Sequence, residues 1–302
     1  MNKLRIIFFL LAVAGGCYVA KAQEIKELEN NQYCIVSADM SLVVDASRGG
    51  KILSFKYKDQ EVLNQGRFPN SFGSTFWTSP QAQWNWPPVP EYDTKPFTAE
   101  LKDGRLVLTG EKSERFGYRI RKVMHVCQHD GAIVITYSII NESGETRQVA
   151  PWEISRVPNG GLLFFEADKV EPANNMKGLP FTFSGGIASY EMDEAQENRK
   201  INADGKGWLA FNNGKVLFVK KFQDLQEGQA APAEAEIQVY ANPGKTFVEI
   251  EEQGPYTTLE PGASVNWTVS WYAVPVEGTE EGNLEKVKEI LKGSQDHEHG
   301  SH

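Results

Sequence analysis

The sequence is poor in several residue types on which common functional sites depend. Its 302 residues include 3 cysteines and 5 histidines, and 31 basic residues stand against 40 acidic ones. A net charge of −9, with no clustered Lys/Arg face and interleaved aromatics, argues against nucleic acid and anionic membrane surfaces as partners. The sequence shows no metal-ligand cluster, phosphate-binding loop or serine nucleophile elbow. We therefore expect neither a metal nor a cofactor.

Long apolar runs are also scarce, and the one that stands out lies at the N-terminus. Ile6 to Ala14 follows Lys3 and Arg5, and Ala20-Lys21-Ala22 supplies small residues that signal peptidase accepts. This pattern predicts a cleaved signal peptide over residues 1–22 and a periplasmic or secreted protein. Because spanning a bilayer takes about 20 residues, we expect no membrane insertion.

The cysteines bear on lipid anchoring and on disulfide pairing. Cys17 lies in the predicted leader, where Ala14 is a poor substitute for the aliphatic residue expected three positions before a lipidated cysteine. We therefore expect cleavage after Ala22 rather than anchoring at Cys17. An oxidising compartment permits a disulfide between Cys34 and Cys127. Because each lies in an apolar strand pattern and the sequence does not place them side by side, we expect two unpaired, buried thiols.

What the chain does contain is period-two alternation, the signature of strands with one face in a core. Ile133–Ile139 and Val265–Ala273 show it clearly, and the second segment is entered through a Pro261-Gly262 turn. Three further dipeptides between alternating runs tolerate the positive φ of tight hairpin turns. They predict antiparallel hairpins at Asp103-Gly104, Asp130-Gly131 and Asn213-Gly214.

Helical spacing is confined to the end of the chain, at Leu284, Val287, Ile290 and Leu291. The sequence shows no repeat, no long linker and no change of composition. We therefore expect an all-β chain with one β domain over residues 23–292, including a short C-terminal helix. A polar, His-rich tail over residues 293–302 is predicted to be disordered.

Three of the 7 tryptophans, Trp77, Trp84 and Trp86, lie within ten residues in a proline-rich segment that begins at Phe76 and continues to Pro90. Proline cannot donate to a sheet, so we expect a loop rather than a central strand. A pyranose offers a C–H face that packs on an indole and hydroxyls that need amide or carboxylate partners. Two interpretations stay open: the rings bind a sugar, or they pin a lid to the core.

A carboxylate and a guanidinium interrupt the apolar strand pattern of residues 151–156. Alternation places Glu153 on the face opposite Trp152 and Arg156, so Glu153 and Arg156 share a face only if a bulge intervenes. They form either a structural ion pair at a sheet margin or part of a site.

A second pair of carboxylates lies late in the chain. Alternation places Glu249 and Glu251 on one face of a strand and Val248 and Ile250 on the core side. Like charges that are partly desolvated raise one pKa, which suits a general base or acid near neutral pH. A solvated edge strand with a charged outer face is the alternative.

The order of three segments resembles that of the aldose 1-epimerases, or galactose mutarotases. Glu251-Glu252-Gln253-Gly254-Pro255 resembles the segment that carries their catalytic base, Ile135–Gly144 resembles the strand and Asn turn before their catalytic histidine, and Ala46–Ile52 resembles their early glycine hairpin. The resemblance implies a galactose mutarotase-like supersandwich of large antiparallel sheets with a sugar site on the concave side. The chain also resembles an exported bacterial branch whose members have no assigned reaction.

The resemblance implies roles for particular residues and also fails at one point. Glu251 would be the base, but Trp152-Glu153 stands where the epimerases have their acid histidine. Epimerisation needs an acid at the ring oxygen, and Glu153 or His125 are the candidates. The residues expected to bind the sugar are Trp77, Trp84, Trp86, Arg156, Glu249 and Arg48.

Three functions follow. The first is an exported carbohydrate-binding protein that takes a mono- or oligosaccharide, and the second is an aldose 1-epimerase-like enzyme. The third is a glycoside hydrolase, which requires the carboxyl groups of Glu153 and Glu251 to lie roughly 5 to 10 Å apart across a cleft. The first is our hypothesis, and the sequence does not indicate an oligomeric state.

Overall fold

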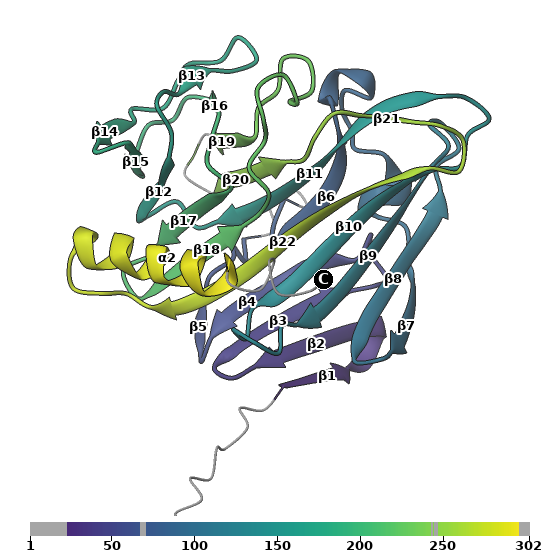
Figure 1. The fold of residues 1–302 in the computed structure, drawn as a ribbon, viewed down its shortest axis with the longest axis horizontal. Helices are drawn as coiled ribbons and strands as arrows, with labels where there is room; N and C mark the ends of the chain where they lie inside the picture. The colour runs from purple at the N-terminus through teal and green to yellow at the C-terminus, as the bar shows by residue number, and fades with distance from the viewer. Residues whose placement is uncertain (1–22, 67–70, 243, 245–246, 296–302) are drawn as a thin grey trace, which may run out of the picture.

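Two large antiparallel sheets pack face to face and carry a helix near the C-terminus (Figure 1). The computed structural model describes residues 23–66, 71–242, 244 and 247–295. The predicted leader, residues 1–22, lies outside this part of the chain. The predicted all-β architecture with large antiparallel sheets is confirmed.

The first sheet has 12 strands, of which ten form one continuous order and two pair at its sides. In spatial order the ten are β1 (Gln23–Glu27), β2 (Gln32–Ser37), β3 (Met40–Asp45), β4 (Lys51–Tyr57), β6 (Ser74–Ser79), β11 (Arg147–Val157), β20 (Val248–Gln253), β19 (Ile237–Ala241), β16 (Arg199–Ala203) and β13 (Glu171–Pro172). The other two are β5 (Gln60–Glu61), beside β4, and β21 (Thr257–Leu259), beside β11.

The second sheet has 10 strands. In spatial order they are β14 (Thr182–Ser184), β15 (Ile187–Glu191), β12 (Leu162–Glu166), β17 (Trp208–Asn212), β18 (Val216–Lys221), β22 (Ser264–Pro275), β10 (Ile133–Asn141), β9 (Tyr118–Val126), β8 (Arg105–Lys112) and β7 (Thr98–Lys102). The helices are η1 (Glu29–Asn31), η2 (Gln81–Gln83), α1 (Pro90–Asp93) and α2 (Glu280–Gln295).

The turn chemistry of the sequence predicts the hairpins correctly. The three dipeptides connect β7 to β8, β9 to β10 and β17 to β18, and the glycine of each has a positive φ, 70° at Gly104, 76° at Gly131 and 86° at Gly214. Such a φ costs glycine little, whereas a side chain would strain it. Strands β10 and β22 cover the two segments of clearest alternation and pair with each other.

The main core lies between the two sheets. Phe76 of β6 stacks on Tyr137 of β10 with ring centroids 4.3 Å apart. Phe55 of β4 meets Phe218 of β18 and Trp271 of β22, each at 5.2 Å. These rings come from both sheets, so their burial holds the two layers together.

The segment of clustered tryptophans differs from the sequence prediction at its start. Trp77 lies in β6, a strand in the middle of the 12-stranded sheet, with β4 and β11 as its neighbours. All the prolines follow Ser79, where the strand ends, so they do not interrupt its ladder. The prediction of a loop is therefore wrong for Trp77 and holds for the residues after Pro80.

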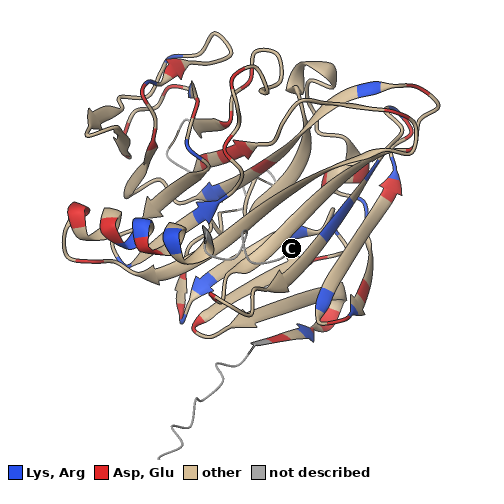
Figure 2. Ribbon diagram, viewed as in Figure 1, with Lys and Arg blue, Asp and Glu red and all other residues tan. Residues whose placement is uncertain are grey.

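Helix α2 confirms the helix that the spacing near the end of the chain predicts, and it is longer than predicted. It carries Glu280 and Glu281 in its first turn and Lys292 in its last, which suits the helix dipole (Figure 2). The helix continues to Gln295, so the first residues of the predicted tail are helical, and residues 296–302 lie outside the described part. In the residues that the structure describes, no helix has the length and apolar character that crossing a membrane requires.

Cys34 and Cys127 are both free, as expected. They are half-buried rather than buried, so that part of the prediction is wrong. Cys34 alternates with the buried residues of β2 and points away from the core. An apolar alternation identifies the strand, but a small residue within it can lie on either face.

Candidate functional site

Five neighbouring strands of the 12-stranded sheet, β6, β11, β20, β19 and β16, share an outer face that points away from the core. Residues paired directly across strands point to the same side of a sheet. The register pairs Trp77 with Trp152 and Arg156 with Glu249, and Glu249 in turn with Tyr240. Side chains that are far apart in the sequence are thereby brought onto one surface.

This surface forms the floor of a cavity of about 340 Å³. Its volume lies at the lower end of the range for small-molecule sites, which runs from about 300 to 1,000 Å³. Loops after β13 and β19 and around η2 form its walls. The described residues that line it are Ser71, Trp77, Gln81, Trp86, Trp152, Asn174, Met176, Lys200, Tyr240, Asn242, Phe247 and Glu249.

Two of the lining indoles are fixed by hydrogen bonds to carboxylates. Trp77 Nε1 donates to Asp93 Oδ1 at 3.1 Å, and Trp152 Nε1 donates to Glu251 Oε2 at 2.8 Å. The Trp77 ring meets that of Trp152 edge to face at 5.6 Å and that of Trp86 edge to face at 6.2 Å. Trp86 is 65% exposed, an unusual exposure for a tryptophan. The result is an ordered aromatic wall with one ring open to solvent.

Trp84 has a different role from its neighbours. It is 3% exposed, and its Nε1 donates to the carbonyl oxygen of Thr78 at 2.8 Å. Its ring packs against Trp77 at 5.6 Å and against Trp152 at 6.3 Å. Trp84 is absent from the described cavity lining, so it supports the wall from behind. Trp84 therefore matches the interpretation in which a ring pins the segment to the core, whereas Trp86 is exposed at the cavity, where the sugar-binding interpretation stays open.

Glu251 lies on the outer face, as alternation predicts, but it is fully buried. Its Oε2 accepts hydrogen bonds from Trp152 and, at 3.1 Å, from Lys200 Nζ, while its Oε1 has no hydrogen-bond partner in the described structure. Burial raises the pKa of Glu251 to about 7, with Lys200 opposing and Glu249 adding to the rise. The alternative of a solvated edge strand is wrong, because β20 lies between β11 and β19.

Arg156 and Glu249 form an ion pair, with Arg156 Nε 2.8 Å from Glu249 Oε1. Arg156 is 2% exposed, donates through Nη1 to Thr75 Oγ1 at 3.2 Å and lies over the Trp77 ring. The structural ion pair considered from the sequence therefore exists, but with Glu249 in place of Glu153 and in the middle of the sheet. Glu249 also lines the cavity, whereas Arg156 lies behind it.

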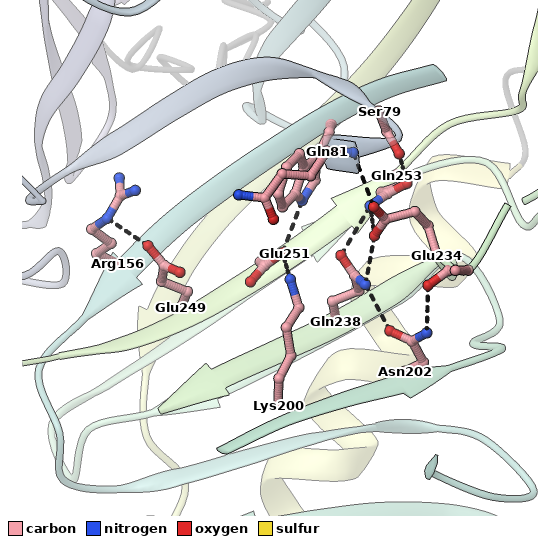
Figure 3. A network of polar contacts seen from close by, with 12 residues as sticks. Ser79, Gln81, Arg156, Lys200, Asn202, Glu234, Gln238, Glu249, Glu251 and Gln253 are labelled. Atoms are coloured by element: carbon pink, nitrogen blue, oxygen red, sulfur yellow. Dashed lines mark hydrogen bonds and ion pairs between the residues drawn. The ribbon is translucent and has the colours of Figure 1, made fainter. Parts of the chain in front are cut away.

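A network of amide and carboxylate side chains borders the cavity (Figure 3). Gln253 Nε2 donates to Gln238 Oε1 at 2.9 Å, and Gln253 Oε1 accepts from Ser79 Oγ at 2.7 Å. Glu234 accepts from Gln238 Nε2 at 2.9 Å and from the backbone N–H of Gln81 at 3.1 Å. Because the buried amides are satisfied, the network fixes the turn that places Gln81 at the cavity.

Glu153 lies on the opposite face of the sheet, in the core. Its carboxylate accepts hydrogen bonds from Ser74, Ser155 and Lys220, and Lys220 also binds Glu252. Burial is the largest influence on Glu153 and opposes its ionisation, but the charge of Lys220 together with hydrogen bonds from Glu252, Lys220 and Ser74 holds the pKa below its usual range. The register of β11 shows no bulge here, so Glu153 and Glu251 do not flank one cleft. This geometry removes the pair that a glycoside hydrolase would need, and it removes Glu153 as the acid.

The other two residues expected at the site lie outside the cavity. His125 shares the outward face of β9 with Arg119 and Arg121, as predicted, but β9 belongs to the 10-stranded sheet and contributes no residue to the described lining. Arg48 lies in the turn between β3 and β4. Its charge contributes to lowering the pKa of Lys51 to about 8, after burial and the charge of Arg156.

A larger cavity, of about 790 Å³, lies between the end of α2 and the turns of two hairpins. The hydroxyls of its two tyrosines donate hydrogen bonds to carboxylates, Tyr57 to Asp39 and Tyr272 to Asp130. Gly293 also borders it. We place the candidate site at the smaller cavity because aromatic faces and buried charges converge there. Among the described residues no group of three or more His, Cys, Asp or Glu side chains could hold a metal ion.

Sequence reasoning missed Lys200, Tyr240 and Phe247. Lys200 and Asn202 alternate with Ile201, a period-two signal too short to identify by itself. Their placement at the site depends on the pairing of β16 with β19 and of β19 with β20. Such long-range pairing leaves no local mark in one sequence.

Comparisons with known proteins bear on the fold. No family model matches the sequence, and no curated protein matches it. A proposed aldose 1-epimerase from Escherichia coli K12 is similar in structure, with a TM-score of 0.58, 13% identity and coverage of 84% of this chain and 100% of that chain. A galactose mutarotase-like protein from Lactobacillus casei ATCC 334 is also similar, with a TM-score of 0.57, 13% identity and coverage of 80% and 100%.

A third similar structure is a galactose mutarotase-like protein from Clostridium acetobutylicum, with a TM-score of 0.55, 10% identity and coverage of 85% of this chain and 99% of that chain. Identities this low establish architecture and do not transfer an activity. The two-sheet architecture, the antiparallel order and these structural likenesses together show that the chain has the galactose mutarotase-like fold.

Proposed function

We propose that this protein is an exported carbohydrate-binding protein and that the cavity on the outer face of the 12-stranded sheet is its sugar site. The observation that supports it most is the wall formed by Trp77, Trp86 and Trp152, with Trp86 exposed at its edge. Indole faces pack on the C–H face of a pyranose, and Gln81 and Asn174 stand beside them as partners for hydroxyls.

The test is binding of immobilised and free glycans by the purified protein. We expect a glycan array to retain at least one sugar and calorimetry to confirm its binding. Trp86→Ala removes the exposed ring and should abolish retention, whereas Phe183→Ala, at a ring that is 49% exposed on β14, should leave it unchanged. A wild-type protein that retains no glycan would refute the proposal.

Export is the second part of the proposal, and the pattern of residues 1–22 supports it. Expression of the full chain in a bacterial host, followed by fractionation, tests it directly. We expect the mature protein in the periplasm or medium with Gln23 as its first residue. A full-length chain in the cytoplasm would contradict export, and a membrane-bound chain beginning at Cys17 would support lipid anchoring instead.

Aldose 1-epimerase-like catalysis is the alternative, and one observation favours it. The pKa of Glu251 is raised to about 7, where a carboxylate serves as a base at neutral pH. Against it, Glu251 is fully buried, and neither Glu153 nor His125 stands where an acid would be needed. Polarimetry on fresh α-anomers discriminates: an enzyme accelerates mutarotation and Glu251→Gln does not, while a binding protein gives equal rates.

A further inference from the structure

Lys200 is the lining residue whose charge the geometry leaves available for a ligand. Its side chain is 6% exposed, and it rises from β16 toward Glu251 (Figure 3). The ammonium lies 5.0 Å from the centre of the Trp152 ring, which itself lines the cavity. An ammonium carries three donors, and within the described chain Glu251 is the acceptor with which it forms a hydrogen bond. Donor capacity therefore remains beside the aromatic wall.

The other charges near the cavity are matched. Glu249 is the only carboxylate among the described lining residues, and Arg156 neutralises it at 2.8 Å. Lys51, which lies behind the lining, is 3.9 Å from Asp93. Lys200 forms an ion pair with Glu251 at 3.1 Å, but Glu251 is fully buried and does not line the cavity, and burial disfavours its charged form. Lys200 therefore sets the sign of the charge that a ligand meets on the floor of the cavity.

We propose that the site selects an acidic sugar, one that places a carboxylate against Lys200 while its ring packs on the tryptophan wall. This inference rests on the proposed function and specifies its ligand class. Withdrawing an ammonium from water is costly, and an anionic acceptor compensates far more than a neutral hydroxyl does. A lysine acts as a point charge, so it fits one carboxylate without requiring a particular planar geometry.

The test compares sugars that differ only at this group. We would titrate the purified protein with glucuronate against glucose and with galacturonate against galactose, by calorimetry at low and high salt. The wild type should bind one uronate at least about tenfold more tightly than its neutral counterpart, as a charge-assisted hydrogen bond predicts. Raising the salt should weaken uronate binding and leave the neutral sugar unaffected, because only the charged pair is screened.

Substitutions at Lys200 measure how much this side chain contributes to uronate affinity. Lys200→Met should remove about tenfold in uronate affinity while changing neutral-sugar affinity less than about threefold. The double variant Lys200→Met/Glu251→Gln removes both charges of the buried pair and should show the same loss, which controls for misfolding of the single variant. Lys215→Met, at an exposed lysine of the hairpin between β17 and β18, should change neither affinity.

The outcomes separate this inference from the function on which it rests. If the wild type binds a neutral sugar as tightly as the matching uronate, the acidic-sugar inference fails and carbohydrate binding stands. If Lys200→Met keeps the uronate preference, the inference fails in its assignment of the residue. If no sugar of either kind is bound and the glycan array is empty, both proposals fail together.

Discussion

Glu251 and Glu252 are neighbours in β20, yet their carboxyl groups lie on opposite faces of the 12-stranded sheet, one at the candidate site and the other in the core. Both are fully buried. Glu251 meets Lys200 from the same sheet, and Glu252 meets Lys220 from the opposite sheet. One strand thus contributes to the candidate site and to an inter-sheet ion cluster, and the two can be altered separately.

The buried cluster of Glu153, Lys220 and Glu252 predicts that one substitution lowers the free energy of unfolding strongly and that another hardly changes it. Lys220→Met leaves the charge of Glu153 buried without a cation, which typically costs about 3 to 5 kcal/mol. Burial and the charge of Glu153 raise the pKa of Glu252 well above its usual range, which favours the neutral form of Glu252. Glu252→Gln should therefore change the free energy of unfolding by less than about 1 kcal/mol.

Urea unfolding of the two variants measures these values. Lys286→Met, at a lysine on α2 whose side chain is 36% exposed, is the matched control. If Lys220→Met is no more destabilising than that control, the cluster does not hold the sheets together. A loss in Glu252→Gln as large as that in Lys220→Met would show that Glu252 is ionised.

Trp84 and Trp86 predict opposite phenotypes although they are two positions apart. Trp84→Ala removes a buried ring and should lower the free energy of unfolding by about 3 to 5 kcal/mol. Trp86→Ala should change it by less than about 1 kcal/mol, because most of this ring is exposed, while sugar binding is lost. Thermal unfolding and calorimetry on the same samples distinguish the two, and equal loss of stability would contradict the assignment.

The features that could be predicted from the sequence are those with a local cause. Glycine turns placed three hairpins, because their positive φ is a property of two adjacent residues. Alternation placed Glu249 and Glu251 on one face and separated Glu153 from Arg156, because no bulge interrupts either strand. Glu249, which lines the candidate cavity, and Glu251, which lies beside it, are therefore predictable from alternation alone.

The remaining features depend on which strands pair. The sequence does not reveal that β20 lies in the middle of a sheet, so a solvated edge could not be ruled out for Glu251. It does not bring Lys200 to that carboxylate, because β16 reaches it only across β19. The prolines after Ser79 predict a loop for the whole segment, whereas its first residues, Trp77 among them, form a strand. The first two of these errors have their cause in long-range strand pairing, and the third in a local proline signal that begins only where the strand ends.

The buried carboxyl of Glu251 predicts a pH dependence of stability. Its pKa is about 7 in the folded chain against an ordinary value of 4.5, so the folded state retains a proton that the unfolded state has lost. The stabilisation is complete below about pH 4.5 and is lost as the pH rises through 7. Relative to Glu251→Gln, the wild type should lose on the order of 3 kcal/mol between pH 4 and pH 8.

Urea unfolding at several pH values in that range tests this expectation. Glu289→Gln is a suitable control, because Glu289 lies on α2 with 67% of its side chain exposed. The control should follow the wild type at every pH. If the difference between wild type and Glu251→Gln is constant with pH, Glu251 does not titrate in this range.

Glu251 also predicts how uronate binding responds to pH, if Lys200 holds the ligand carboxylate. The charged and titratable groups around Glu251 are Lys200, Glu249, Glu234 and Tyr240, and the ligand would add a negative charge to this set. That charge favours the protonated form of Glu251, so binding takes up a proton. Affinity should rise roughly fivefold from pH 8 to pH 6 for a one-unit rise in the pKa of Glu251.

Calorimetry in two buffers of different ionisation enthalpy measures the proton uptake, and Glu251→Gln should abolish both the proton uptake and the pH dependence of the affinity. A uronate affinity that falls toward pH 6 would mean that the ligand carboxylate does not lie beside this pair.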